Sequence, residues 1–417
     1  MSTDRPDNIF SKYLELLREL KEKDLLSRLK HLRWRIGRSR LRPIANSILM
    51  PFSRLMLKPI LKPLRSRLGS SLVKARRSIY KFITHWFFTL IFPINFVLAV
   101  RNKNIKHANS VIHISYMVHI PYYTTHILRK QGIKADYLAV GGQSPWWNKY
   151  DYHFPKNWPP TPWGEFVFFW KVVSKYEIIH THFGVILSQS GWELRWLKRM
   201  GRKVVLHYRG CEARDPDLNM KLHPEVNICQ ICDYNRSGCR EGNERVNRVR
   251  KYVDLSLVTT PDLQDFVKDA IHFPFFTPEI DYDKYKAAPR HRSSTDALKI
   301  VHATNHPGIE GTEQIRKAVD NLTARGYKIN FVFLRGVTPE EVLTEFREAD
   351  LTIGKMKMGY YANAQIESMF LGIPAVTCVR PEFMTPELEN SGFIFTTLRD
   401  LEQTIEFYIT HPEALAA

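Results

Sequence analysis

Short apolar runs alternate with segments of helical periodicity through the last third of the chain. Residues 298–322 combine an apolar run, a loop and a helix-like pattern, and residues 328–336 form a second apolar run. Residues 338–354 add another helix-like segment followed by a third run. Strands that alternate with helical segments are typical of α/β folds, so this region is predicted to contain a parallel sheet.

The segment 359–377 carries the most informative pattern. It predicts a short helix with Asn363 as N-cap, then Gly372 in a left-handed conformation and a strand over 373–378. The apolar face of this helix would hold Ile366, Met369 and Phe370. Glu367 lies one turn after Asn363, and a helix that begins at a sheet edge directs its amides at phosphates and this carboxylate at a ribose. The alternative is an ordinary helix–strand unit with a surface glutamate.

A similar alternation occurs earlier in the chain. A strand is predicted over 110–118, a helix over 121–131 and another helix near 166–174. Two later apolar strands end in polar residues, EIIHTHFG at 177–184 and KVVLHYRG at 203–210. Open α/β sheets bind ligands at the carboxyl edge, so the candidate residues there are His180, His182, His207 and Arg209. Strand-end histidines are also common as purely structural residues.

The first 107 residues differ from the rest in charge and pattern. They hold 24 Lys and Arg residues against six acids, a net charge of +18, whereas the remainder has a net charge of +1. Apolar residues recur at helical spacing over 10–36 and again over 44–68, where prolines interrupt the pattern. Basic amphipathic helices bind anionic bilayers, so residues 1–107 are predicted to be a membrane-associating extension. The alternative is packing on the rest of the chain or on a second subunit.

A 19-residue, mostly apolar stretch follows at 82–100. It is nearly long enough to span a bilayer, but it contains His85, Pro93 and Asn95. Basic residues on both sides give it no orientation by the positive-inside rule. An interfacial or re-entrant helix is therefore favoured over a span. The stretch lies too far from Met1 to be a cleavable signal peptide.

Composition narrows the functional classes. The chain has 417 residues, 44% of them hydrophobic and 25% charged, which is enough apolar sequence for two buried cores. A uniformly basic chain would suggest nucleic-acid binding, but the excess positive charge lies in residues 1–107, so nucleic acid is not the expected partner. The sequence leaves the oligomeric state open.

Four of the five cysteines lie close together, at Cys211, Cys229, Cys232 and Cys239. One Cys-x2-Cys pair with two flanking thiols offers a tetrahedral structural zinc site, in which His207 or His223 would replace one thiolate. The spacing fits reduced thiols that pack a loop equally well. Disulfides or an iron–sulfur cluster are further alternatives.

A polar, proline-containing stretch suits a linker between two domains. The predicted organisation is an extension at 1–107, a first α/β domain at 108–275, a linker at 276–297 and a second α/β domain at 298–417.

The sequence IESMFLGIPAV at 366–376 resembles the E-A-M-A-x-G-x-P-V signature of retaining glycosyltransferases with the GT-B fold, especially glycosyltransferase family 4. The resemblance covers about residues 110 to 410. It implies two Rossmann-like domains facing a cleft, a nucleoside-diphosphate sugar as donor substrate, and no catalytic metal.

The resemblance also implies roles for individual residues. Glu367 would hold the ribose, and Gly359, Tyr360 and Asn363 would contact the phosphates and the sugar. His182 matches a family histidine that lines the acceptor site, and it is the first candidate for acceptor positioning or proton handling. The residues HYRG at 207–210 are similar to the family's H-Y-H-G-S-D turn, where Arg209 would meet an anionic acceptor. His180 and His207 would lie on the same acceptor side.

Two features depart from the family's pattern. The family places an Arg and a Lys before a glycine as R-x5-K-G, whereas this chain has Thr304 and Glu310 before Gly311. Gly359 stands where the first acid of the family's Glu-x7-Glu pair is expected. Four basic side chains nearby would return positive charge to the diphosphate: His306, Arg335, Lys355 and Lys357.

The resemblance, together with the basic residues 1–107, implies a membrane-associated glycosyltransferase that moves a sugar, with retention, from a nucleoside-diphosphate donor to a lipid-linked or cell-surface polysaccharide acceptor. The cytoplasmic face of the cell membrane is the expected location. Because of the departures at Thr304, Glu310 and Gly359, the competing hypothesis is a catalytically inactive scaffold of the same fold that recruits a polysaccharide-assembly partner to the membrane.

Overall fold

The computed structural model describes residues 82, 86–104, 107–142, 148–155, 162–188, 190–224, 227–233, 236–273 and 296–415. The amphipathic segments predicted over 10–68 lie outside these residues, as does nearly all of the linker predicted over 276–297.

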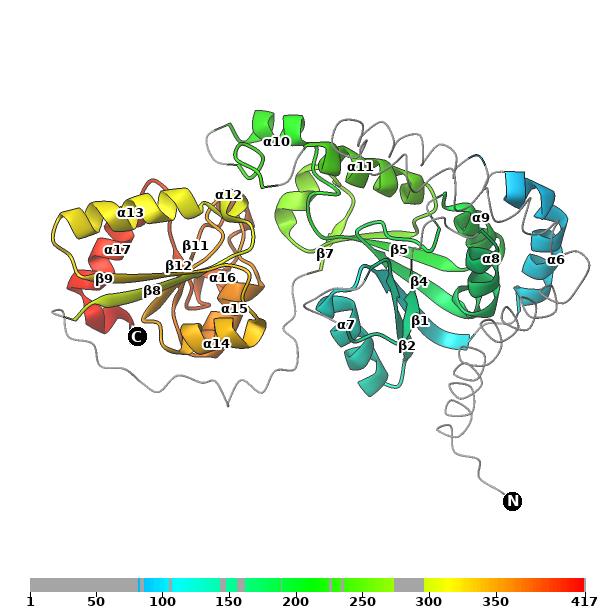
Figure 1. Cartoon of the computed structure of the whole chain (residues 1–417), viewed down its shortest axis with the longest axis horizontal. Coiled ribbons are helices and arrows are strands. Elements are labelled where there is room, and N and C mark those ends of the chain that lie inside the picture. Colours follow the sequence, from blue (N-terminus) through cyan, green and yellow to red (C-terminus); the bar gives the residue numbers. More distant parts are fainter. Residues whose placement is uncertain are drawn as a thin grey trace, which may run out of the picture. The chain divides into compact units, whose positions relative to one another are not determined.

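Within the described residues, the first domain contains a parallel sheet with the strand order β3-β2-β1-β4-β5-β6-β7 (Figure 1). The order reverses beside β1, as in dinucleotide-binding Rossmann folds. The strands are β1 His107–Ser115, β2 Lys134–Val140, β3 Tyr152–Phe154, β4 Tyr176–His182, β5 Lys203–Tyr208, β6 Leu255–Val258 and β7 Ile271–His272. The helices are α6 Phe92–Asn102, α7 His119–Lys130, α8 Pro162–Lys171, α9 Trp192–Arg199, α10 Pro216–Leu222 and α11 Arg236–Arg250.

Alternate residues of β2 bury their side chains on opposite faces of this sheet. Leu138 and Val140 belong to the larger core, which also contains side chains of α8, α9 and α11. Tyr137 and Ala139 pack instead with Met117 and with α7. Since a parallel sheet must be covered on both faces, this alternation accounts for helices on both sides.

Within the described residues, the second domain contains a parallel sheet with the order β12-β11-β10-β8-β9, which reverses between β8 and β10. The strands are β8 Leu298–Ala303, β9 Ile329–Leu334, β10 Leu351–Ile353, β11 Ala375–Thr377 and β12 Ile394–Phe395. The helices are α12 Pro307–Glu310, α13 Thr312–Ala324, α14 Pro339–Arg347, α15 Asn363–Phe370, α16 Pro386–Glu389 and α17 Leu401–Thr410.

The second sheet is also covered on both faces. Ile300 packs in a core with α13 and α17, whereas its neighbour Val301 packs with α14 on the opposite side. The predicted α/β class with two Rossmann-like domains is confirmed.

The start of α15 differs from the sequence prediction. The helix begins at Asn363 itself, and Ala362 occupies the N-cap position with its N–H bonded to Gln365 Oε1 at 2.9 Å. Gln365 and Ser368 are the buried residues of the helix, whereas Phe370 is exposed, so the predicted apolar face is wrong in part. The reason is that Ser368 Oγ accepts a hydrogen bond from Thr352 Oγ1 of β10 at 2.8 Å. After the helix, Gly372 has the predicted left-handed conformation, with φ of 79°.

Residues 86–102 are helical except for a turn at 91, and the last part of this segment is α6. Polar contacts fasten it to the first domain. Trp170 Nε1 donates to Asn95 Oδ1 at 2.9 Å. The buried Arg202 donates from Nη2 to the carbonyl of Asn102 at 2.9 Å and from Nε to that of Ser174 at 3.1 Å. In the part of the chain that the structure describes, no helix is both long enough and apolar enough to cross a bilayer.

Arg202→Met would remove the donors to the carbonyls of Asn102 and Ser174. Two buried carbonyls without donors are expected to lower the free energy of unfolding by about 2–4 kcal/mol. The matched control is Arg347→Met at an exposed position of α14, where a change below about 0.5 kcal/mol is expected. Denaturant unfolding followed by circular dichroism measures both, and equal effects would contradict the role given to Arg202.

Candidate functional site

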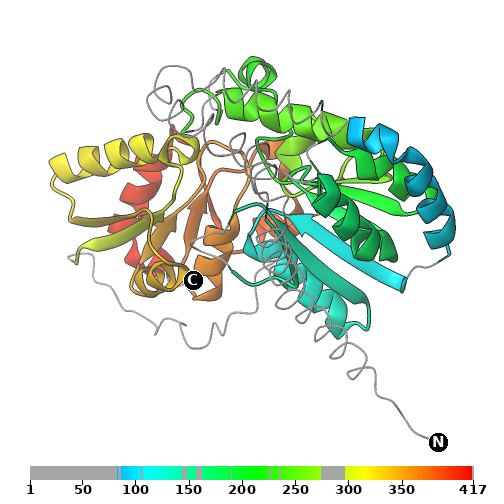
Figure 2. The ribbon, with the colours of Figure 1, turned by 45° about the vertical axis from the view of Figure 1, so that its right-hand side comes forward.

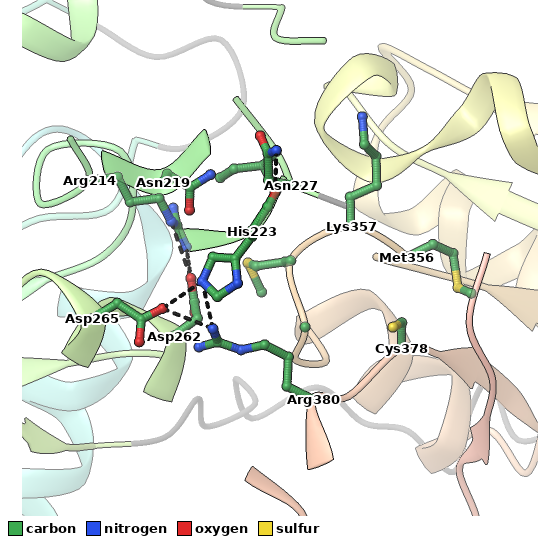
Figure 3. A pocket seen from close by; sticks show the side chains of 13 residues that line it. Arg214, Asn219, His223, Asn227, Asp262, Asp265, Met356, Lys357, Cys378 and Arg380 are labelled. Carbon is green, nitrogen blue, oxygen red and sulfur yellow. Dashed lines mark hydrogen bonds and ion pairs between the residues drawn. The ribbon is translucent and has the colours of Figure 1, made fainter. Parts of the chain in front are cut away.

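A cavity of about 100 Å³ has walls from the first domain and from the loops after β10 and β11 (Figure 3). This volume corresponds to about three water molecules, so the cavity suits a small polar group rather than a whole nucleotide. Its charged and polar lining residues are Arg214, Asn219, His223, Asn227, Asp262, Asp265, Lys357 and Arg380.

Two of the cavity's cations are paired with carboxylates. Arg380 Nη1 lies 2.9 Å from Asp265 Oδ2 and 2.8 Å from His223 Nε2. Arg214 pairs with Asp262, and although burial opposes its charge, this carboxylate raises the pKa of Arg214 above its ordinary value. The pairs hold both guanidinium groups at the cavity wall.

Several polar atoms of the lining residues are unmatched. Among the described residues, Arg380 Nη2 and Asn219 Nδ2 are buried donors without a hydrogen-bond partner, and Asp262 Oδ1 is a buried acceptor in the same state. An unmatched buried group costs about 1–3 kcal/mol, so such groups indicate a place where a ligand or water completes the bonding. Lys357 adds a positive charge, and its Nζ donates to the carbonyl of Gly308 at 3.2 Å. The donors and the positive charge suit an oxyanion such as a phosphate.

Arg380 explains why residue 359 is a glycine. Gly359 has φ of 78°, and a Cβ at this position would lie 2.5 Å from Arg380 Cγ. The Arg380 N–H also donates to the carbonyl of Gly359 at 3.0 Å. A guanidinium therefore occupies the place beside residue 359 where the family pattern expects a carboxylate. The sequence analysis missed Arg380, although a cation three residues after a buried strand was a usable signal.

Glu367 lies on α15, one turn after the start of the helix. Burial raises the pKa of its carboxyl from 4.5 to about 7. No hydrogen bond or ion pair of this carboxyl is found among the described residues, and Asn363 Oδ1 is also buried without a partner. One helix thus presents two acceptors for which the described residues offer no donor.

Three further predicted residues lie in the second domain: His306 and Glu310 at the two ends of α12, and Arg335 after β9. Burial raises the pKa of Glu310, and the charge of Lys355 opposes this shift. Burial also lowers the pKa of His306, which lies at the N-cap of α12. Arg335 is exposed in the loop after β9 and does not line the cavity.

Gly311, at the end of α12, leaves room for the side chain of Lys357. Gly311 is left-handed, with φ of 87°, and a Cβ there would lie 3.3 Å from Lys357 Cγ. The aliphatic stem of Lys357 therefore packs against the backbone, and burial lowers the pKa of its amine. Tyr360 lies next to Gly359 and stacks on Tyr361, with 4.3 Å between the ring centroids.

Four histidines of the first domain share one face of the sheet. His113 of β1 pairs in register with His180 of β4, and His182 pairs with His207 of β5. Arg209 Nη2 lies 3.0 Å from His182 Nδ1, and His182 Nε2 lies 3.1 Å from His113 Nδ1. Because arginine can only donate, His182 Nδ1 accepts and its Nε2 carries the proton.

These hydrogen bonds determine what the cluster can do. Burial lowers the pKa of His182 and His207 well below 6.5, so both are neutral at neutral pH. His182 is fully buried with both ring nitrogens engaged, which leaves none free for proton transfer in this conformation. Arg209 is the cation next to the strand end. The sequence analysis did not single out His113, which completes the chain of hydrogen bonds.

Among the described residues, His113, His180 and His182 form a group whose ligand nitrogens lie within 4.8 Å of one another. A metal ion there would need His182 Nε2, which already donates to His113, and would lie near the charge of Arg209. Like charges in a dry site repel, so the hydrogen-bonded chain explains this cluster better than a cation site does.

The cysteines predicted to bind zinc form no disulfide among the described residues. Burial is the main cause that raises the pKa of Cys211, Cys229 and Cys239, and interactions among the cysteines add to it. The four residues therefore lie in one region, although the described residues place no three of these thiols in a group that could hold a metal ion. Zinc binding by this set, which includes Cys232, stays a prediction.

No protein-family model matches the chain, and no curated protein matches it. Solved structures that resemble it include a sucrose-phosphate synthase from Thermosynechococcus elongatus, with 12% identity over 74% of this chain and 91% of that chain and a TM-score of 0.45. The catalytic domain of starch synthase IV from Arabidopsis thaliana, bound to ADP and acarbose, has 11% identity over 73% and 93% and a TM-score of 0.46. A putative UDP-N-acetylglucosamine 2-epimerase from Listeria monocytogenes has 11% identity over 74% and 90% and a TM-score of 0.40. The reaction therefore has to be argued from the residues of the site.

Glu367→Gln is expected to change how stability depends on pH. The pKa of Glu367 is about 7 in the folded protein and 4.5 in the unfolded chain. As pH rises, the unfolded chain therefore loses this proton at a lower pH than the folded protein does. The wild-type free energy of unfolding therefore falls as pH rises from about 4.5 to about 7. Glutamine buries no charge, so the variant should be more stable by about 1–3 kcal/mol at pH 8 and by much less at pH 5. Urea unfolding at both pH values tests this, with exposed Asp320→Asn as control; an equal gain at both would refute the prediction.

Gly359→Ala is expected to displace Arg380 from Asp265. The matched control is Gly372→Ala, because Gly372 has nearly the same φ, 79°, but open space around a Cβ. Both variants carry the backbone strain of about 1–2 kcal/mol, and only Gly359→Ala adds the clash with Arg380. The free energy of unfolding should fall by at least about 1 kcal/mol more at residue 359 than at residue 372. Equal losses would show that Arg380 moves aside freely.

Proposed function

We propose that this protein is a glycosyltransferase that uses a nucleoside-diphosphate sugar as donor. The topology of the second domain supports the proposal. Its strand order reverses between β8 and β10, and the loops after these strands carry His306, Gly311, Lys355 and Lys357. Ligands of open α/β sheets bind outside the carboxyl ends of the strands at such a reversal.

The observation that carries the proposal is the carboxyl of Glu367, which is partly buried on α15 and for which the described residues supply no hydrogen-bond donor. A ribose offers two adjacent hydroxyl donors, and their hydrogen bonds would replace the solvation that the ionised carboxylate loses on burial. A general acidic surface site would instead leave the carboxylate in water with an ordinary pKa.

The cations support binding of the diphosphate. In the transfer, the bond between the anomeric carbon and the phosphate oxygen breaks, and its electron pair stays on the departing nucleoside diphosphate. The acceptor hydroxyl forms the new bond to the anomeric carbon, and its proton passes to the departing diphosphate oxygen, so the step balances without a separate base. Arg380 and Lys357 would stabilise the negative charge of the leaving group, and Arg209 would attract an anionic part of the acceptor.

We further propose that the anomeric configuration is retained and that the acceptor is a lipid-linked or cell-surface polysaccharide at the cytoplasmic face of the membrane. The resemblance of residues 366–376 to the retaining family supports the first point. The net charge of +18 in residues 1–107 supports the second. No catalytic metal is proposed, because side chains already supply positive charge.

A catalytically inactive scaffold is the second candidate. The guanidinium of Arg380 beside Gly359 favours it, because the transferred sugar would lack a carboxylate partner there. Glu310 also favours it, since a carboxyl replaces a cation in the loop after β8.

Purified full-length protein incubated with UDP-, GDP-, ADP- and dTDP-sugars and a membrane lipid extract tests the two candidates. The glycosyltransferase proposal expects release of a nucleoside diphosphate with at least one donor. Glu367→Ala should raise the KM for that donor about 10–100-fold with a smaller change in kcat, because the lost contact is to the ribose. Asp320→Ala is the control. Absence of turnover together with absence of nucleotide binding would favour the scaffold.

A further inference from the structure

The helical segment that ends in α6 has its polar side turned inward. The helix residues that face the first domain include Asn95, Ala99 and Asn102, all of them buried. The opposite side of the segment carries large apolar residues, Leu90 before the turn at residue 91 and Ile94, Phe96, Val97 and Val100 of α6. We call these five residues the outer face of α6. Leu90 is 75% exposed, and Val97 and Val100 are each 63% exposed. A helix on a water-facing surface normally has the reverse arrangement.

Specific contacts hold the helix in this orientation. The hydrogen bond from Trp170 to Asn95 and the contacts of Arg202 with the end of α6 keep the polar side against the protein. Phe88, on the same inward side, stacks on Trp192 with 3.9 Å between the ring centroids. Rotating the helix to hide its apolar residues would break these contacts. The outer face is therefore built to meet an environment other than water.

The border of the outer face is aromatic and cationic. Trp163 of α8 is 59% exposed and lies 6.4 Å from the ring of Phe87 at the beginning of the segment. Exposed Arg101 lies at the end of the helix, and the exposed guanidinium groups of Arg195 and Arg199 lie over the ring of Trp196 on α9. Figures 1 and 2 show α6 on the outer side of α8 and α9. Indole and guanidinium groups around an apolar face are typical of the zone between lipid headgroups and acyl chains.

We propose that the outer face of α6 lies in the interfacial zone of an anionic lipid bilayer, with the helix parallel to the membrane plane. Charge complementarity favours a bilayer over a second copy of the chain, because two copies would bring the same cations together. The 24 Lys and Arg residues among residues 1–107 add to the attraction. An 11-residue α6 suits a helix that lies on the membrane. This inference stands whether the protein is a glycosyltransferase or a scaffold.

Flotation of the full-length protein with vesicles of 70% phosphatidylcholine and 30% phosphatidylglycerol tests the inference. The test variant carries Leu90→Gln, Val97→Gln and Val100→Gln. The matched control replaces three exposed apolar residues elsewhere, with Leu222→Gln, Leu255→Gln and Phe407→Gln. We expect the test variant to lose at least 10-fold in partition coefficient and the control to change less than twofold.

The salt concentration distinguishes vesicle binding through the apolar outer face from binding through the basic residues 1–107. Raising the salt from 0.15 to 0.5 M weakens electrostatic attraction but not apolar burial, so the wild type should keep part of its binding and the test variant almost none. Unchanged partitioning of the test variant would overturn the inference. If partitioning is unchanged and sedimentation shows that the variant converts a dimer to a monomer, the face is a subunit interface. If the partitioning of the test variant is unchanged and its free energy of unfolding is lower than that of the wild type, another part of the chain covers the face. Donor substrate is absent from these assays, so their outcome is independent of turnover.

Discussion

Parallel strands that are covered on both faces leave one place for polar chemistry, the edge where their carboxyl ends meet. Both sheets of this protein obey that constraint, because helices pack on each side of them. The loops after β8, β10 and β11 therefore collect Glu310, Lys357 and Arg380, while the ends of β4 and β5 collect His182 and Arg209. The strand order decides which of these loops become neighbours.

At residue 359 the chain departs from the Glu-x7-Glu pattern, because a glycine replaces the first acid. The neighbouring Arg380 nevertheless keeps a charged group at this place. A glycine is needed because the arginine side chain fills the space that a Cβ would occupy. The arginine is held in turn by Asp265 and His223. One cation placed by a glycine, and another placed by the stem of Lys357 on Gly311, return positive charge to a domain that lacks it at Thr304 and Glu310.

Buried polar side chains fall into two groups in this molecule, those with hydrogen-bond partners and those without. Asn95 and Arg202 are matched by partners, and their hydrogen bonds fix the orientation of α6. Asn363 Oδ1 is buried with no donor among the described residues, and the partly buried carboxyl of Glu367 also meets no donor there. The same physical cost of an unpaired buried group thus fixes the orientation of α6 and leaves α15 with acceptors that other groups can satisfy.

The sequence by itself determined the alternation of strands and helices, the left-handed turn at Gly372 and the place of Glu367 on a helix, because these depend on residues only a few positions apart. Only the tertiary structure decided that Arg380 meets His223, which lies 157 positions away, and that Asn95 faces inward towards Trp170, 75 positions away. It also decided that both nitrogens of His182 are engaged. Local periodicity carries no information about such contacts, since they arise when distant strands and helices pack together and each buried polar group has to find a partner.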